Sequence, residues 1–169
     1  LLIYDIKYIF GHQPSFPVLE YKVQLEPENI AQEFIKISEG IYEIGHTGKT
    51  FCFDNELGRH NVFLHDFEIS NRLVTNSEYI EFIESGGYQN FNLWHAEGWD
   101  FIQNNNITAP LYWHKVDGKW MQYTLQGFTR VEGNLPVSHV SMYEAFAYAQ
   151  WKNMRLPTKF ESEIASSKF

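Results

Sequence analysis

The first residues of the chain place apolar side chains at the spacing of a helix. These side chains share one helical face: Leu2, Ile6, Ile9 and Phe10. The pattern predicts a helix over residues 1–10. Pro14 and Pro17 cannot continue it, because proline lacks a backbone N–H and fixes φ. We therefore expect an extended connector over residues 11–27, followed by a turn at residues 27–29.

Two later stretches carry the β-branched and aromatic residues that are typical of strands. In the first they are Phe34, Ile35, Ile37, Ile41, Tyr42 and Ile44, and in the second Val62, Leu64, Phe67 and Ile69. Glu39–Gly40 interrupts the first stretch and predicts a hairpin turn there. Residues 45–59 contain three glycines, Asp54 and Asn55, and they predict a loop.

Three helix starts carry one capping signature, a hydroxyl residue followed three positions later by glutamate. The pairs are Thr75 with Glu78, Ser141 with Glu144 and Thr158 with Glu161. After the first pair we expect a buried stripe of Tyr79, Ile80, Phe82 and Ile83, ended by Gly86–Gly87. After the second pair, apolar side chains recur at helical spacing at Ala145, Tyr148, Ala149 and Met154.

Asp117–Gly118 gives the strongest hairpin signal, because Asp-Gly accepts the positive φ of a type I′ turn. It predicts paired strands over residues 112–116 and 119–123. A short helix is expected over residues 92–104, and a strand at Pro136. Irregular strands, short helices and long loops together predict an α+β fold.

Composition narrows the class of protein. The chain has 169 residues, 44% of them hydrophobic and 17% aromatic, which fits one domain with a core and excludes disorder for most of its length. A net charge of -8 disfavours a nucleic-acid partner. No apolar run reaches the roughly 18–20 residues of a membrane span, so no membrane partner is expected. A single cysteine, Cys52, and no visible signal peptide predict a reducing, cytoplasmic location.

Histidine spacing does not indicate a metal site. The seven histidines are His12, His46, His60, His65, His95, His114 and His139. His60 and His65 are five apart on a predicted strand, which sends their side chains to opposite faces. We interpret the histidines as surface or loop residues, and assign no metal ligand and no cofactor-binding residue.

Other candidate chemistry has a simpler structural explanation. Cys52 lacks a cationic neighbour that would make it reactive, so packing is favoured. Ser138 and His139, adjacent on a predicted strand, point to opposite faces and form no dyad. Gly45–Thr50 lacks the glycine spacing of a phosphate loop. The residues alone name no catalytic side chain.

Four tryptophans offer the last candidate site. Trp94, Trp99, Trp113 and Trp120 could face a cationic ligand, because indole rings attract cations. A core built from large rings is the favoured explanation.

Several motifs, in order, resemble one family. Residues 41–87 resemble the opening of a formylglycine-generating-enzyme-like domain, of the sulfatase-modifying-factor superfamily, whose fold is related to C-type lectins. LPVSHVSMYEAFAYAQWKNMRLPT resembles that superfamily's P-V-x-x-V-S-x-x-E-A…RLPT signature. More specifically, the chain is similar to sulfoxide synthases of ergothioneine biosynthesis in FDNEL (53–57), NRLVTN (71–76) and APLYWHKVDGKW (109–120). LLIYDIKYIFGHQP is similar to the segment that joins their N-terminal helical domain to the lectin-like domain.

This resemblance implies a reaction and a division of the chain. The family's reaction is O2-dependent and uses non-haem iron(II). It joins the thiol of cysteine or γ-glutamylcysteine to the imidazole C2 of trimethylhistidine (hercynine) and gives a sulfoxide. Two of the three iron-binding histidines are expected in an H-x-x-x-H-Q-E helix ahead of the segment matching Leu1, outside this chain. Residues 1–30 would be the end of the helical domain and a linker, and residues 31–169 the N-terminal part of the lectin-like domain.

One departure from the family and two alternatives stay open. The family continues RLPT with E-A-E-W-E, whereas this chain has Lys159–Glu163, with Ser162 at the usual tryptophan. The alternatives are a non-catalytic lectin-like binding module and a formylglycine-generating enzyme.

The two ends predict a piece of a longer protein. The chain starts at Leu1 without methionine and stops within a predicted helix at Phe169. We expect the piece to be inactive by itself. We also expect exposed apolar side chains, Leu2, Ile6, Ile9 and Ile164 among them, and hence self-association.

Overall fold

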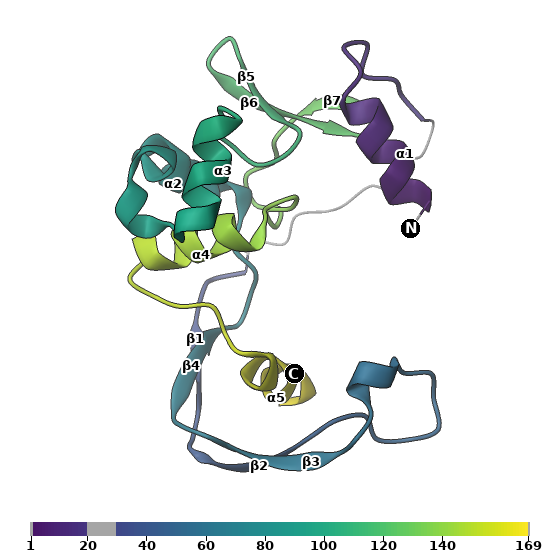
Figure 1. Cartoon of the computed structure of the whole chain (residues 1–169), viewed down its shortest axis with the longest axis vertical. Helices are drawn as coiled ribbons and strands as arrows, with labels where there is room; N and C mark the ends of the chain where they lie inside the picture. The colour runs from purple at the N-terminus through teal and green to yellow at the C-terminus, as the bar shows by residue number, and fades with distance from the viewer. Residues whose placement is uncertain (1, 20–29, 169) are drawn as a thin grey trace. The chain divides into compact units, whose positions relative to one another are not determined.

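Two units interleave along the chain, and the computed structural model describes their residues 2–19 and 30–168 (Figure 1). Unit 1 takes residues 1–29 and 73–155, and unit 2 takes residues 30–72 and 156–169. The predicted turn at residues 27–29 and the second half of the predicted connector lie outside the described residues. No helix of the described part is long and apolar enough to cross a membrane.

Unit 1 is built on helices that enclose an aromatic core. α2 (Asn76–Glu84), α3 (Ala96–Asn104) and α4 (Met142–Trp151) gather around it in Figure 1, with the 3-10 turns η2 (Gly87–Gln89) and η3 (Phe91–Leu93) between α2 and α3. The core residues are Tyr79, Phe82, Tyr88, Trp94, Ile102, Ala147 and Tyr148. The predicted helix over residues 92–104 is thus a 3-10 turn followed by α3.

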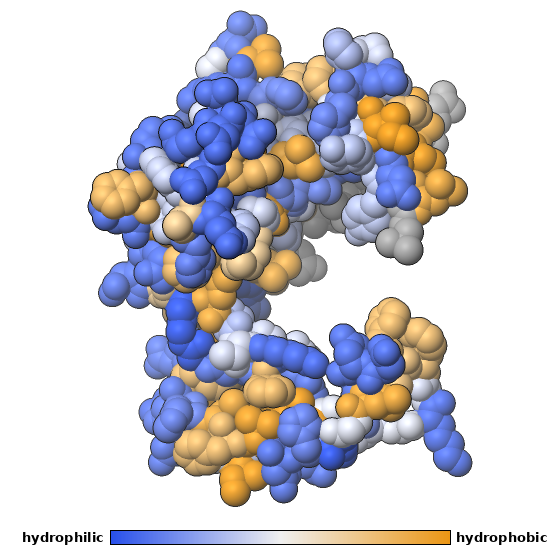
Figure 2. Space-filling model, viewed as in Figure 1, coloured by the Kyte–Doolittle hydropathy of each residue, from blue (hydrophilic) through white to orange (hydrophobic). Residues whose placement is uncertain are grey.

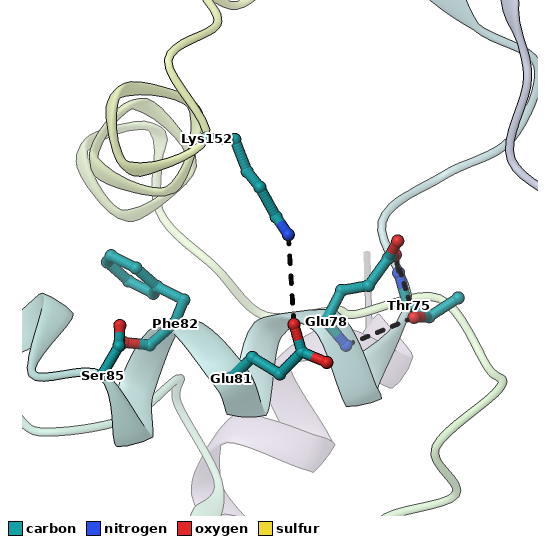
Figure 3. A network of polar contacts seen from close by, with 6 residues as sticks. All are labelled: Thr75, Glu78, Glu81, Phe82, Ser85 and Lys152. Atoms are coloured by element: carbon teal, nitrogen blue, oxygen red, sulfur yellow. Dashed lines mark hydrogen bonds and ion pairs between the residues drawn. The ribbon is translucent and has the colours of Figure 1, made fainter.

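Two capping boxes begin the helices of this core, as predicted. Glu78 accepts the Thr75 backbone N–H at 2.8 Å, and the Glu78 N–H donates to the Thr75 hydroxyl (Figure 3). Ser141 and Glu144 repeat the arrangement at α4. Figure 3 also shows Lys152, just after α4, reaching the Glu81 carboxylate of α2 at 4.0 Å.

Unit 1 also contains a three-stranded antiparallel sheet in the order β5–β6–β7. β5 (Trp113–Val116) and β6 (Lys119–Thr124) form the predicted hairpin, with Asp117 and Gly118 both at positive φ. β7 (Gly127–Arg130) was not predicted. The prediction of a strand at Pro136 is wrong, because Pro136 forms only an isolated bridge with Thr75.

The predicted N-terminal helix is present as α1 (Leu2–Gly11). Turns follow at residues 12–15. Two hydrogen bonds connect the irregular segment after them to β6 and to the residue that follows β6. The Tyr123 hydroxyl donates to the Pro17 carbonyl at 2.6 Å, and the Leu19 N–H donates to the Leu125 carbonyl.

Unit 2 is a ribbon of two antiparallel strand pairs. β1 (Phe34–Ile37) pairs with β4 (Phe67–Ser70), and β2 (Gly40–Ile44) pairs with β3 (His60–Leu64). The predicted hairpin turn at Glu39–Gly40 is therefore wrong, since β1 and β2 pair with different strands. Residues 38–39 are a bend along the ribbon, and the Glu39 N–H donates there to the Asp66 carboxylate. The ribbon turns back through the predicted loop, which holds η1 (Asp54–Glu56).

One face of this ribbon is covered by α5 (Lys159–Lys168), which starts at the predicted Thr158–Glu161 capping box. Ile37, Ile44, Leu64, Phe67 and Ile164 form the unit 2 core. The expectation that Ile164 is exposed is wrong, because it is only 6% exposed in that core. Leu2 and Ile9 are exposed as expected, whereas Ile6 is only half-exposed, and Figure 2 shows apolar surface over α1.

Candidate functional site

A cluster of titratable side chains lies in unit 1, where α1 meets the residue before β5. Lys7 of α1 places its Nζ 2.6 Å from Nε2 of His139, a residue of the segment before α4. The same Nζ lies over the Tyr112 ring, 4.9 Å from its centroid. Tyr112 and His139 meet edge to face, with ring centroids 4.9 Å apart. The three side chains therefore form one contact group, called here the Lys7 cluster.

Two members of the Lys7 cluster hold an unusual backbone conformation. Tyr112 has φ 74° and His139 has φ 62°, in the left-handed region that non-glycine residues rarely occupy. Such positions cost about 1–3 kcal/mol each and persist only where the surroundings enforce them. Here the Tyr123 N–H donates to the Tyr112 carbonyl at 3.0 Å, and the Leu111 N–H donates to the His139 carbonyl at 3.3 Å.

Spacing on α1 explains how the helix fits this cluster. Lys7 and Gly11 are four residues apart and share a helical face. A Cβ on Gly11 would lie 2.5 Å from Cε1 of Tyr112, so only glycine allows the tyrosine ring this close. No residue of α1 is fully buried.

Burial shifts the pKa values of the three side chains in the direction that favours their neutral forms. Burial lowers the pKa of His139, and the neighbouring Lys7 charge lowers it further. Burial also lowers the pKa of Lys7, and it raises the pKa of Tyr112. A neutral imidazole can accept a hydrogen bond from the ammonium group, so the cluster can hold and orient α1.

The histidines were interpreted as surface or loop residues. His139 lies in a loop, as expected, but its side chain is half-buried, as is that of His46. His12, His60, His65, His95 and His114 are exposed, as expected. The predicted strand at Ser138 and His139 is wrong, because the described structure has no strand there and His139 is left-handed. The Lys7 contact was missed. The shared face of Lys7 and Gly11 was visible in the sequence, whereas the backbone of His139 was not.

The tryptophan cluster is mainly core, as favoured. Trp94 and Trp113 are buried, and the Trp94 indole N–H donates to the Gly87 carbonyl at 2.9 Å. The cation near Trp120 is Lys115 of this chain, 5.3 Å from the ring centroid. The indole N–H groups of Trp113 and Trp120 are buried without an acceptor among the described residues.

Unit 2 holds a hollow of about 500 Å³ beside the loop of residues 45–59. Its lining includes His46, His60, Lys159, Phe160, Ser162 and Glu163. The Glu163 carboxylate accepts the Gly45 N–H at 2.6 Å, which ties the loop to α5. Ser162, the residue at the usual tryptophan of the family, thus borders open space, and Phe160 packs against the unit 2 core instead.

The described residues include no group of three histidine, cysteine, aspartate or glutamate side chains that could hold a metal ion. Cys52 is half-buried, and its neighbours in the sequence, Phe51 and Phe53, are exposed. Neither observation identifies a reaction centre within the described part of the chain.

Comparison with known proteins relates the chain to one protein family. The family described as sulfatase-modifying factor enzyme 1-like domain matches residues 21–168. Hercynine oxygenase of Mycolicibacterium smegmatis is 39% identical over 112 residues, and that of Mycobacterium tuberculosis is 41% identical over 115 residues. Each alignment covers 66% of this chain and 26% of the relative. A formylglycine-generating enzyme of Thermomonospora curvata is 31% identical over 157 residues, which are 83% of this chain and 50% of that enzyme. The chain thus spans about a quarter of the length of the hercynine oxygenases.

Proposed function

Because the chain belongs to the family of sulfatase-modifying factor enzyme 1-like domains, we propose that it is part of an O2-dependent sulfoxide synthase of ergothioneine biosynthesis. The match confirms the α+β, formylglycine-generating-enzyme-like fold predicted from the sequence. The proposed reaction joins the thiol of cysteine or γ-glutamylcysteine to the imidazole C2 of trimethylhistidine. The observation that carries it is the 39–41% identity to hercynine oxygenases.

The position of α1 supports the same proposal. The family profile starts at residue 21, so α1 precedes the matched domain, and it is seated on that domain's β5–β6 hairpin by the Lys7 cluster. In our proposal residues 1–30 are the end of a helical domain and its linker, and residues 31–169 belong to the lectin-like domain. We also propose a cytoplasmic location, based on the single cysteine.

Iron(II) would supply the O2 chemistry in the proposed reaction. The described residues do not fit an iron site, since they contain no suitable group of three side chains. The ligands are proposed to lie in a helix ahead of Leu1. The role proposed for this chain is to hold that helical segment and to form part of the substrate-binding domain.

The direct test needs the complete coding sequence on both sides of these residues. The encoded protein is purified and incubated with trimethylhistidine, O2 and either cysteine or γ-glutamylcysteine, and products are identified by mass spectrometry. We expect a carbon–sulfur-bonded sulfoxide with one of the thiols, and none without O2. A complete protein that is loaded with iron(II) and forms no such product would refute the proposal.

Two alternatives have specific support and separate assays. The Thermomonospora curvata relative favours a formylglycine-generating enzyme, which would convert a peptide cysteine to formylglycine. A mouse relative named inactive Cα-formylglycine-generating enzyme 2 is 33% identical over 126 residues, and it favours a binding module without turnover. Formylglycine in a cysteine peptide would establish the first alternative. Saturable binding of trimethylhistidine without product in either assay would establish the second.

A further inference from the structure

Few contacts hold α1 to the rest of unit 1. Leu2, Ile3, Tyr4, Tyr8 and Ile9 are between 55% and 72% exposed, so most of the apolar surface of the helix faces solvent. The half-buried side consists of Ile6, Lys7, Phe10 and Gly11. No residue of α1 is fully buried, so hydrophobic burial, the usual reason that a helix stays on a domain, is limited to the partial burial of Ile6 and Phe10.

The polar contacts of this half-buried side are specific. The Lys7 ammonium donates to Nε2 of His139 and lies over the Tyr112 ring, which also packs on Gly11. Lys36 and Arg59, in contrast, each face a carboxylate, that of Asp66 and of Glu43 respectively. Lys7 instead faces an imidazole, and no ion pair to a carboxylate is found for it in the described part of the chain.

Because the partner of Lys7 is an imidazole, the contact depends on the protonation state of His139. Neutral His139 can present a lone pair on Nε2 to the ammonium group, whereas protonated His139 presents an N–H and a positive charge at 2.6 Å. Tyr8 of α1 and Tyr123 of β6 are the titratable groups beside Tyr112, and tyrosines stay neutral below about pH 10. His12, whose ring lies 4.3 Å from that of Tyr8 at a tilt of 49°, is the other histidine at this end of α1.

We propose that Lys7, His139 and Tyr112 form a latch that holds α1 against the β5–β6 hairpin while His139 is neutral and releases it when His139 is protonated. Lys7 and His139 are positioning residues in this arrangement. The strained backbones of Tyr112 and His139 aim both rings at Lys7. The latch goes beyond the proposed reaction and is testable without it.

Hydrogen exchange of the α1 amides measures the latch directly. A helix of 10 residues is marginal once it leaves the domain, so its amides lose protection when the latch opens. Mass spectrometry of the 169-residue chain follows α1 peptides and, as an internal reference, α2 peptides. Rates at each pH are divided by the intrinsic exchange rate of an unfolded peptide.

Variants at Lys7 test the contact at pH 7.5. We expect Lys7→Met to lower α1 protection about tenfold, the size of a lost hydrogen bond to a charged group. Lys7→Arg keeps a donor and is expected to restore most of the protection. Lys119→Met, an exposed lysine of the same unit, is the matched control and is expected to change nothing. Equal protection in Lys7→Met and the native chain would overturn the proposal.

Variants at the histidines test the pH dependence between pH 5 and 8. In the native chain we expect α1 protection to fall on acidification relative to α2. Asparagine tolerates the left-handed conformation, so His139→Asn keeps the backbone and is expected to abolish this dependence. His12→Asn is the control, since protonation of His12 near the helix C-terminus would stabilise α1 rather than release it. A pH dependence that persists in His139→Asn and vanishes in His12→Asn would overturn the proposal. If His139→Asn unfolds unit 1, the comparison of Lys7→Met with Lys7→Arg still decides it.

Discussion

Gly87 tests how tightly the aromatic core of unit 1 is packed. A Cβ on this residue would lie 2.2 Å from Cε2 and 2.4 Å from Cδ2 of Phe82. Phe82 is 0% exposed, and its ring is surrounded by aromatic neighbours at centroid distances of 5.3–5.8 Å. The ring therefore has no open space into which it could move. Because Gly87 has no positive φ, Gly87→Ala adds a steric conflict and no backbone strain.

We expect Gly87→Ala to destabilise unit 1 by about 1–3 kcal/mol, the usual cost of overpacking a core. For a chain of this size that lowers the Tm by about 2–4 °C per kcal/mol. Tryptophan fluorescence during urea unfolding reports unit 1 specifically, since all five tryptophans lie in residues 73–155.

A second substitution identifies the cause. In a Phe82→Leu background the smaller side chain leaves room, so Gly87→Ala is expected to cost less than in the native background. Gly118→Ala is the control for backbone strain, because Gly118 has φ +75° and nothing within 4 Å of its Cβ position. An equal cost of Gly87→Ala in both backgrounds would refute the steric explanation.

Further predictions concern the caps, the buried tyrosines and the unit 2 core. Ser141→Ala removes the hydroxyl that accepts the Glu144 N–H at 3.2 Å, and it should cost about 1 kcal/mol in urea unfolding; no change would mean that the cap is dispensable. Burial raises the pKa of Tyr79 and Tyr88, so their stabilising effect is complete below about pH 10 and is lost as the pH rises above it. Absorbance at high pH should show them ionising only with unfolding, and ionisation before the fluorescence change would contradict this. Ile164→Ala should cost about 2–5 kcal/mol in unit 2, seen as faster hydrogen exchange in β2 and β3 peptides, and unchanged exchange there would place Ile164 outside the core.

Local signals in the sequence predicted local structure correctly. The three capping boxes and the Asp117–Gly118 hairpin each depend on residues a few positions apart, and all four are present. The hairpin turn at Glu39–Gly40 was wrong because strand pairing in unit 2 is not local. Ile37 pairs with Phe67, thirty residues away, and the Glu39–Gly40 sequence does not indicate that strand partner.

The candidate site was the least predictable part. Its members come from α1, the residue before β5 and the segment before α4, so only tertiary structure brings them together. The sequence does not indicate that Tyr112 and His139 have positive φ, because residues other than glycine adopt that conformation only where contacts enforce it. The family resemblance predicted the fold. The segments that carry it contain Lys7, Tyr112 and His139, but the resemblance gave no sign that these three side chains meet.

The interleaving of the two units has a consequence for how the chain folds during synthesis. The β-ribbon of unit 2 is translated before the helical core of unit 1. The Glu163 carboxylate that holds Gly45 comes 118 residues after Gly45, and Ile164 comes 97 residues after Phe67. The ribbon therefore emerges from the ribosome before α5 can cover its apolar face. A two-stranded ribbon alone is only marginally stable, so it is not expected to hold its structure at that stage. The helical core of unit 1 is translated next and can close before α5 exists. We expect unit 2 to be the last to fold and its uncovered strands to be the part that a chaperone protects.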